Sequence, residues 1–294
     1  MPEIRNSQSA VRISELPIGI FDSGVGGLTV YRALHEHLPN EHFIYLGDTA
    51  RVPYGTKSLS TVERYAIENA RFLAARAIKL LIVACNTASA LALPAIRNAV
   101  NVAVIGVIEP GARAAVRLTS GKQIGVIATE ATVASSAYSK AIGAIDPQID
   151  VVERACPLFV ALAEEGWGDT DVARTVAREY LTEFRGRGIG ALVLGCTHYP
   201  VLRTVISDAV GPAVQLIDSG EATACEVESF LASNQLARPQ RQLTAQRKLC
   251  DDLDHFFVTD AAQRFARVAE RILGTTPAVL EAVEVWGHDE LRTH

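Results

Sequence analysis

From Pro17 onward, short apolar runs alternate with longer stretches in which apolar residues recur every three or four positions. Such alternation is typical of parallel strands joined by amphipathic helices. Three amphipathic stretches predict helices over residues 61–79, 171–185 and 261–273, and the run HFFVTD before the last of these predicts a strand. Eight further runs predict strands that begin near Ile18, Ile44, Ile82, Val104, Ile124, Val152, Leu192 and Gln215. The predicted fold class is therefore α/β.

The intervals between the eight predicted strands repeat. In the first four, successive strands begin 26, 38 and 22 residues apart, and in the second four 28, 40 and 23 residues apart. We therefore predict an internal duplication, with two similar doubly wound (flavodoxin-like) parallel-sheet domains related by pseudo-symmetry and an active site in the cleft between them. Residues 17–107 and 212–294 are assigned to the first domain and residues 108–211 to the second. Residues 1–16 are expected to form a flexible extension, and no role is assigned beyond about Thr276.

Composition narrows the class of protein. The chain has 294 residues, 49% of them hydrophobic, and a net charge of −5 with scattered basic residues, which argues against a nucleic-acid partner. No apolar run reaches the ~18 residues of a membrane span, and the N-terminus lacks the apolar core of a signal peptide. We therefore expect a cytoplasmic protein without a membrane partner. The five cysteines include no CxxC pair, which favours free thiols over a disulfide framework or a zinc ribbon.

Polar residues gather where the predicted strands end. In open parallel sheets, ligands bind outside the carboxyl ends of the strands, so these residues are candidates for a site. In the first domain they are Asp22 and Ser23, then Asp48, Pro53, Tyr54 and Gly55, then Cys85, Asn86 and Thr87, and then Glu109. In the second domain they are Thr129 and Thr132, then Cys156, then Cys196, Thr197 and His198, and then Asp218 and Ser219. We expect the two edges to face each other across one small cleft.

The glycine-rich segment DSGVGGLTV follows the first predicted strand and has two interpretations. A turn of this kind often holds a phosphate at a helix N-terminus. This one lacks the GxGxxG spacing of a dinucleotide site and the GK[ST] of a P-loop, and Asp22 would repel a phosphate. We interpret Asp22 as a partner for an ammonium group or as a group that orients a neighbouring thiol, and the glycines as residues that permit a tight turn and a close approach of the helix.

Cys85 and Cys196 occupy equivalent strand ends, and each is followed by hydroxyl, amide or imidazole side chains. One free cysteine is often only a small buried apolar residue, but two in matching settings favour chemistry. A helix N-terminus behind Cys85 would favour its thiolate, which a thiol of pKa ~8.5 needs in order to act as a base. His198 could orient or deprotonate Cys196, and Glu164 and Glu165 are candidates for auxiliary acids. A metal bound by Cys85, Cys196 and His198 is the less favoured alternative.

Several segments, in this order, resemble glutamate racemases of the aspartate/glutamate racemase family: GIFDSGVGGLTV, GDTARVPYG, VACNTAS, GVIEPG, CPLFV, LGCTHYP and IDSG. They extend from about Pro17 to Gly220, and VTD with the following helix continues the likeness towards Leu273. Aspartate racemases share the fold plan, but the DSGVGGLTV and PYG blocks favour glutamate. The resemblance implies a homodimeric enzyme, independent of cofactors and metals, that supplies D-glutamate for bacterial peptidoglycan.

The resemblance also implies roles for individual residues. Cys85 and Cys196 match the two catalytic acid/bases, Cys85 acting on D-glutamate and Cys196 on L-glutamate. Asp22 matches a carboxylate beside the first cysteine and His198 an imidazole beside the second, and Glu164 is preferred over Glu165 as the auxiliary glutamate. The substrate-contacting positions are Asp22, Ser23, Pro53, Tyr54, Gly55, Asn86, Thr87, Thr129, Thr132, Thr197 and His198. Residue 128 is Ala where the family usually has Gly.

Racemisation needs a proton removed from one face of the α-carbon and returned to the other, which one base on each face achieves without moving the substrate. No lysine lies in a convincing position for a pyridoxal Schiff base, so amide and hydroxyl donors in a cleft closed to water would have to stabilise the carbanion. The contrasting hypothesis is a non-enzymatic two-lobed sensor that closes on a small anion and uses its cysteines as redox or metal ligands.

Overall fold

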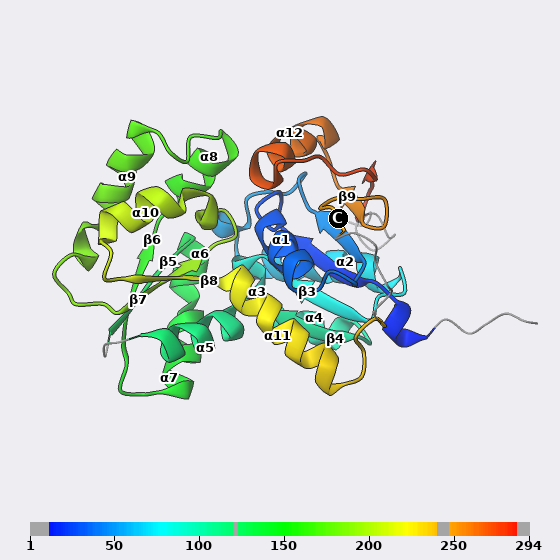
Figure 1. The fold of residues 1–294 in the computed structure, drawn as a ribbon, viewed down its shortest axis with the longest axis horizontal. Helices are drawn as coiled ribbons and strands as arrows, with labels where there is room; N and C mark the ends of the chain where they lie inside the picture. Colours follow the sequence, from blue (N-terminus) through cyan, green and yellow to red (C-terminus); the bar gives the residue numbers. More distant parts are fainter. Residues whose placement is uncertain (1–11, 120–122, 240–246, 287–294) are drawn as a thin grey trace, which may run out of the picture.

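The computed structural model describes residues 12–119, 123–239 and 247–286. In this part of the chain, two lobes lie side by side, each built on one parallel sheet (Figure 1). The first sheet has the order β10-β9-β2-β1-β3-β4, with β1 (Ile18–Asp22), β2 (Phe43–Gly47), β3 (Leu80–Val83), β4 (Ala103–Gly106), β9 (His255–Val258) and β10 (Leu280–Ala282). The second has the order β6-β5-β7-β8, with β5 (Gln123–Ala128), β6 (Asp150–Ala155), β7 (Ala191–Gly195) and β8 (Gln215–Asp218). The predicted α/β fold class with two parallel sheets is confirmed.

Helices connect the strands and cover both faces of each sheet, as in a doubly wound fold. The first lobe contains α1 (Leu28–His37), α2 (Leu59–Ala74), α3 (Asn86–Leu91), α4 (Leu93–Ala99), α11 (Ser219–Ser233) and α12 (Ala262–Leu273). The second contains α5 (Ile108–Leu118), α6 (Glu130–Ser135), α7 (Ala137–Ile145), α8 (Leu158–Glu164), α9 (Asp171–Leu181) and α10 (Arg203–Val210). Short 3₁₀ turns span Ile13–Glu15, Tyr54–Thr56, Thr182–Phe184 and Tyr199–Leu202.

The two sheets share one strand order, which confirms the predicted duplication. In β2-β1-β3-β4 and in β6-β5-β7-β8, the first strand of the unit lies between the second and the third. Cys85 lies two residues after the end of β3, and Cys196 directly follows β7. Both cysteines therefore follow the third strand of their unit, at the carboxyl edge where the sequence predicts them.

The central strands β1, β3, β5 and β7 are mostly apolar because both of their faces are buried. In β7, Leu192 and Leu194 pack towards a core that includes residues of α8, α9 and α10, whereas Ala191 and Val193 pack towards residues of α5 and α7. Strand residues alternate in direction, so this one strand contributes to two cores. Because β7 is buried on both faces, its end, which Cys196 directly follows, is held in place.

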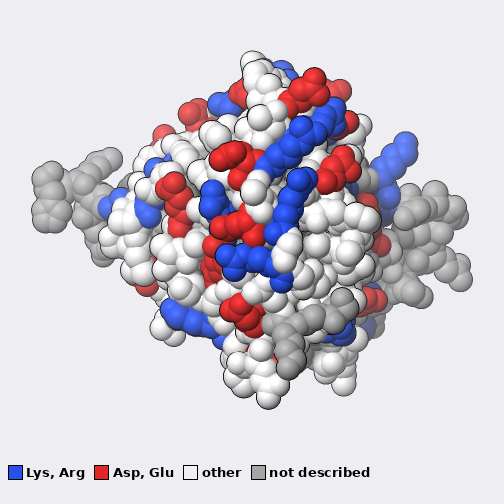
Figure 2. All heavy atoms as spheres, turned by 90° about the vertical axis from the view of Figure 1, so that its left-hand side faces the viewer, with Lys and Arg blue, Asp and Glu red and all other residues white. Residues whose placement is uncertain are grey.

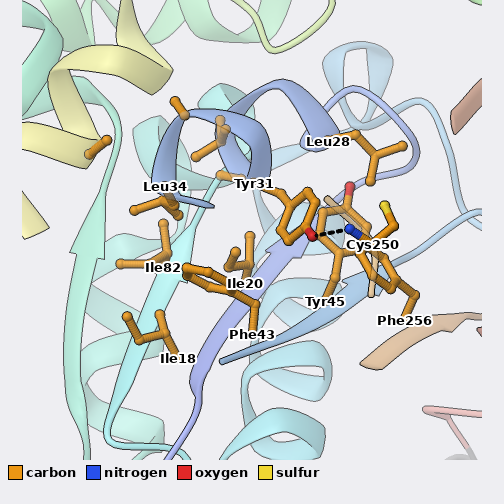
Figure 3. Close-up of a cluster of buried hydrophobic side chains, with 14 of the residues drawn as sticks. Ile18, Ile20, Leu28, Tyr31, Leu34, Phe43, Tyr45, Ile82, Cys250 and Phe256 are labelled. Atoms are coloured by element: carbon orange, nitrogen blue, oxygen red, sulfur yellow. Dashed lines mark hydrogen bonds between the residues drawn. The ribbon is translucent and has the colours of Figure 1, made fainter. Parts of the chain in front are cut away.

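The first sheet is built in the same way and has a more aromatic core. Figure 3 shows Tyr31 of α1 among Phe43, Tyr45 and Phe256 of the strands, next to Cys250. The Tyr31 hydroxyl accepts a hydrogen bond from the Cys250 N–H at 2.8 Å, which ties the segment before β9 to α1. The described residues 247–286 of the tail thus pack on the first lobe, as the sequence predicts.

Two predicted helices are too long. The helix expected over residues 61–79 is α2, which begins at Leu59 after the Ser58 cap and ends at Ala74. Ala77 adopts a left-handed φ of 53°, which a helix cannot continue. The helix expected over residues 171–185 is α9, which ends at Leu181 and is followed by a 3₁₀ turn. The third expectation, over residues 261–273, is met by α12 with Ala261 at its N-cap.

The strand pairing differs from the predicted domain division at one point. β8 pairs with β7, for example Val193 with Ile217, so residues 215–218 belong to the second sheet although the division at residue 211 places them with the first domain. The chain returns to the first lobe at α11, which shares a core with α1. β10 extends the first sheet beyond β9, in a region to which the sequence assigns no role. A three-residue strand is too short to give a period-2 pattern.

The predicted flexible extension over residues 1–16 is described only in part, since residues 1–11 lie outside the described residues. Ile13–Glu15 form a 3₁₀ turn in which the Ser14 carbonyl accepts a hydrogen bond from Lys79 Nζ at 2.9 Å. Lys79 is buried and also pairs with buried Glu41. Residues 13–15 are therefore fixed to the first lobe, contrary to the expectation for this part of the extension.

Charges of both signs are mixed on the surface of the second lobe. Figure 2 shows this face, on which Lys and Arg side chains stand among Asp and Glu side chains. In the part of the chain that the structure describes, no helix has the length and the hydropathy needed to cross a membrane.

Candidate active site

A pocket with about 340 Å³ of empty space, part of which is open to solvent, lies between the two lobes, where the carboxyl edges of the sheets meet. Its lining residues come from both lobes: Ser23, Val52, Pro53, Tyr54, Gly55, Cys85, Asn86, Thr87, Thr129, Val160, Cys196, Thr197 and His198. All of them except Val52 and Val160 are predicted from the sequence. The structure thus brings together both cysteines and most of the candidate site residues.

Three residues with a predicted catalytic or substrate-contacting role do not line this pocket, and neither do the strand-end candidates Asp48, Glu109, Cys156, Asp218 and Ser219. Asp22 is completely buried behind it, next to Ser23. Thr132 is also completely buried, and its hydroxyl lies 3.0 Å from that of Thr129 and 3.3 Å from that of Thr87. Glu164 borders a second, adjoining pocket, at the end of α8. Each of the three forms a hydrogen bond with a residue that lines the pocket.

Cys85 is held at the start of a helix. Its Sγ accepts a hydrogen bond from the Ala88 N–H as the N-cap of α3 and lies 3.5 Å from Ser23 Oγ. Burial and the negative charge of Asp22 raise the pKa of the Cys85 thiol to about 12, although its hydrogen bonds with Ser23 and Ala88 act in the opposite direction. The helix begins where the sequence predicts, but the thiolate is not favoured, because burial and Asp22 outweigh the helix N-terminus.

Cys196 has a cationic neighbour. Its Sγ lies 3.8 Å from Nδ1 of His198, whose Nε2 lies 3.2 Å from Oε1 of Glu164. Burial disfavours the charged imidazole, but the hydrogen bonds to Cys196 and Glu164 prevail and raise the pKa of His198 to about 10. The hydrogen bond from His198 in turn lowers the pKa of Glu164. His198 therefore carries a positive charge at neutral pH.

The choice between the two candidate glutamates follows from these contacts. Glu164 contacts His198 and also accepts a hydrogen bond from Arg264 of α12 at 3.2 Å, whereas Glu165 is 64% exposed and lies 3.9 Å from Arg264. A second arginine of α12, Arg271, donates to the Glu164 carbonyl at 3.0 Å. The end of α8 is thus joined to the first lobe beside the pocket.

Asp22 joins the turn after β1 to the loop that carries Cys196. Its Oδ2 accepts a hydrogen bond from the Gly24 N–H at 2.9 Å, and its Oδ1 accepts one from Thr197 Oγ1 at 3.3 Å. Burial raises the pKa of Asp22, while the charge of His198 acts in the opposite direction. Asp22 is therefore coupled to both cysteine loops: it raises the pKa of Cys85, and it accepts a hydrogen bond from Thr197, which directly follows Cys196.

The glycines of DSGVGGLTV permit close contact between the lobes. A Cβ on residue 26 would lie 2.4 Å from Thr197 Oγ1 and 2.5 Å from His198 Nδ1. No side chain fits there without displacing His198. Thr29 of the same segment donates a hydrogen bond to the Thr197 carbonyl at 2.9 Å. The segment thus holds the Cys196 loop, which explains its glycines without a phosphate.

Neutral hydrogen-bonding groups complete the lining. Asn86 Oδ1 accepts a hydrogen bond from Tyr138, and its Nδ2 is buried with no partner among the described residues. Thr87 Oγ1 lies 2.9 Å from Thr129 Oγ1, so these hydroxyls form a cluster across the two lobes. None of the described residues that line the pocket is Lys or Arg. Apart from the imidazole of His198, the groups that could hold an anion here are amides and hydroxyls.

The loop that carries Tyr54 and Gly55 is fixed from behind. The Tyr54 hydroxyl contacts Asp48 and accepts a hydrogen bond from Asn69 Nδ2 at 3.0 Å, so it does not point towards a ligand. Arg51 binds both carboxylate oxygens of Asp48, at 2.8 and 2.9 Å. Pocket lining by residue 54 therefore comes from its ring and backbone.

Sequence reasoning misses two kinds of contributor. Val52 and Val160 line the pocket but carry no reactive group, so nothing marks them in a sequence. Tyr138 and Arg264 lie on helices and reach the site only through tertiary contacts. For the metal alternative, the described residues contain no group of three or more His, Cys, Asp and Glu side chains that could hold an ion.

A duplicated α/β fold with one thiol from each unit in a shared pocket is an arrangement suited to a racemase, and comparison with known proteins identifies the family. The chain belongs to the Asp/Glu/hydantoin racemase family, whose model matches residues 18–227. A glutamate racemase from Geobacter metallireducens is 54% identical to it over 257 residues, which are 87% of this chain and 92% of that protein. The resemblance drawn from the sequence segments is confirmed.

Solved structures show the same fold. Glutamate racemase from Bacillus anthracis matches with a TM-score of 0.84 at 37% identity, covering 92% of this chain and 98% of that one. The glutamate racemase from Francisella tularensis, solved in complex with D-glutamate, matches with a TM-score of 0.83 at 39% identity and the same coverage.

Proposed function

We propose that this protein interconverts L-glutamate and D-glutamate and so supplies D-glutamate for peptidoglycan synthesis. The observation that carries the proposal is the single pocket lined by Cys85 from one lobe and Cys196 from the other. Membership of the racemase family and the glutamate racemases among its relatives support this activity and substrate. The D-glutamate bound by the Francisella tularensis enzyme supports it as well.

The proposed mechanism uses one cysteine on each face of the α-carbon. In the direction from L to D, the thiolate of Cys196 takes the α-proton, so that the C–H bond breaks, an S–H bond forms and the electron pair stays on the substrate. The thiol of Cys85 then gives its proton to the opposite face, which forms the new C–H bond and leaves a thiolate. The reverse direction exchanges these roles. A raised pKa keeps Cys85 protonated at neutral pH, as the first direction requires.

The neighbours of each thiol have separate roles in this mechanism. Cationic His198, 3.8 Å from Cys196 Sγ, supplies the positive charge that stabilises a thiolate. Glu164 holds the imidazole through Nε2. Asp22 does not line the pocket, so its negative charge acts from behind it: it raises the pKa of Cys85 and would attract the substrate ammonium group through space.

Neutral donors hold the two carboxylates of the substrate and stabilise the carbanion without a cofactor or a metal. The free Nδ2 of Asn86 and the hydroxyl cluster of Thr87, Thr129 and Thr132 are available for one carboxylate. The backbone near Tyr54 and Gly55 is available for the other, together with Ser23, Pro53 and Thr197 at the pocket wall. The proposal extends to a cytoplasmic homodimer, by likeness to the family.

Deuterium incorporation tests the proposal. In deuterated buffer, the wild-type protein should convert L-glutamate to D-glutamate with deuterium at the α-carbon, and should act on L-aspartate at least 100-fold more slowly. A Cys156→Ser variant is the matched control, because Cys156 is also buried at a strand end but does not line the pocket. Loss of activity in the Cys85→Ser/Cys196→Ser double variant together with full activity in the control supports the two-cysteine site. Absence of exchange in the wild type would favour the non-enzymatic sensor.

A further inference from the structure

Tyr138 of α7 is completely buried and contacts the residue next to each cysteine. Its hydroxyl donates a hydrogen bond to Oδ1 of Asn86 at 2.7 Å, and Asn86 directly follows Cys85. Its ring lies against Gly195, which directly precedes Cys196, because a Cβ on residue 195 would lie 2.9 Å from Tyr138 Cε2. One side chain of the second lobe thus spans both cysteine loops.

The hydrogen bond from Tyr138 fixes which way the Asn86 amide faces. With Oδ1 held by the tyrosine, the two N–H donors of Nδ2 are directed away from it, and Nδ2 is buried without a partner among the described residues. A buried amide donor left unpaired costs about 1–3 kcal/mol. Since Asn86 lines the pocket, a carboxylate in that pocket would satisfy these donors.

Packing leaves the tyrosine ring little freedom. A Cβ on residue 111 of α5 would lie 3.3 Å from Tyr138 Cε1, so glycines at 111 and 195 make room for the ring on two sides. Burial raises the pKa of Tyr138, so its hydroxyl keeps its proton and remains a donor at neutral pH. A fixed ring with a permanent donor is suited to orienting an amide.

We propose that Tyr138 is a positioning residue, which orients the Asn86 amide towards a substrate carboxylate and holds the two cysteine loops in register. The inference rests on the proposed function, since it takes glutamate as the ligand of that amide. Tyr138 does not line the pocket, so it acts through Asn86.

Glutamate affinity tests this without turnover. In a Cys196→Ser background, isothermal titration calorimetry should show that Tyr138→Phe binds L-glutamate about tenfold more weakly, because the amide then loses its fixed orientation. Tyr31→Phe is the matched control, since Tyr31 is an equally buried tyrosine whose hydroxyl contacts Asp254 in the first lobe. Tyr31→Phe should lower the melting temperature about as much as Tyr138→Phe does, and its affinity for L-glutamate should stay within twofold of that of the Cys196→Ser parent.

A double-mutant cycle separates positioning from general damage. If Tyr138 acts through Asn86, then Tyr138→Phe should weaken binding less than twofold further in a protein that already carries Asn86→Ala. The inference would be overturned if Tyr138→Phe left the affinity for L-glutamate unchanged. It would also be overturned if the loss of affinity in the double variant equalled the product of the losses in Tyr138→Phe and Asn86→Ala, or if the Cys196→Ser parent bound no glutamate. Racemisation by the wild type is a separate measurement, and its absence would count against the proposed function.

Discussion

Cys85 and Cys196 follow the third strand of their sheets, yet the charged groups beside them are opposite in sign. Cys85 is buried near Asp22, and both burial and that negative charge raise its pKa to about 12. Cys196 lies 3.8 Å from His198, whose pKa is raised to about 10 by its bonds to Cys196 and Glu164. Duplication of the fold has thus placed two thiols alike, and the neighbouring side chains have made them different.

This difference cannot favour one product. The two enantiomers of glutamate are mirror images with equal free energy, so kcat/KM must be the same in both directions. The charges instead set the protonation state from which each turnover starts. A protein with a protonated Cys85 and a cationic His198 is ready for the direction from L to D under the proposed mechanism. Variants that change either charge should therefore alter both directions together.

The largest expected effect among these variants is that of Asp22→Asn. The substitution keeps the shape but removes the negative charge beside Cys85 and the partner proposed for the ammonium group, so kcat/KM should fall about 100-fold for both enantiomers. The pKa of Cys85 should fall as well, which would speed its alkylation by iodoacetamide at pH 8. Stopped assays with each enantiomer and mass spectrometry of the Cys85 peptide measure the two effects.

Asp218→Asn provides the control for Asp22→Asn. Asp218 is also followed by Ser and Gly, and its Oδ1 accepts a hydrogen bond from the Gly220 N–H at 2.8 Å, but it does not line the pocket. Its variant should stay within about twofold of the wild type in kcat/KM. If the Asp22→Asn protein had the kcat/KM of the wild type, the role proposed for Asp22 beside Cys85 would be wrong.

A smaller effect is expected on the Cys196 side. Glu164→Gln removes a carboxylate that raises the pKa of His198, so this pKa should fall and His198 should lose its proton at lower pH. The alkaline limb of the pH–rate profile should move down by about one unit, so kcat should fall by up to about tenfold above about pH 10 and change little at pH 8. Glu165→Gln should leave the profile unchanged, because Glu165 does not contact His198. An unmoved or raised limb in Glu164→Gln would contradict the role of this pair.

Much of the fold could be predicted from the sequence because strands that are buried on both faces appear in it as apolar runs. The apolar runs of β1, β3, β5 and β7 mark the central strands, and their spacing marks the duplication. Edge strands and helix ends give weaker signals in the sequence. β10 is only three residues long, and the end of α2 depends on the backbone conformation of Ala77, which no periodicity reveals.

Some features of the candidate site could likewise be predicted from the sequence, and others could not. Residues that carry chemistry at strand ends, such as Cys85, Cys196 and His198, could be predicted because their position and side chain both point to a cleft. The electrostatics could not, since the pKa of Cys85 depends on burial and on Asp22 from another strand. The role proposed for Tyr138 could not be predicted either, because it depends on a contact with Asn86, which lies 52 positions away in the sequence.

The division of labour between the two cysteines can be measured by exchange in single variants. In deuterated buffer, Cys85→Ser retains only the thiol proposed to act on L-glutamate, and Cys196→Ser only the one proposed to act on D-glutamate. The account predicts that Cys85→Ser incorporates α-deuterium into L-glutamate without inversion and leaves D-glutamate unlabelled, and that Cys196→Ser does the opposite. Racemisation should fall at least 1000-fold in both, as an order of magnitude for the loss of an essential acid or base. Exchange of the wrong enantiomer, or substantial racemisation by either variant, would contradict the account.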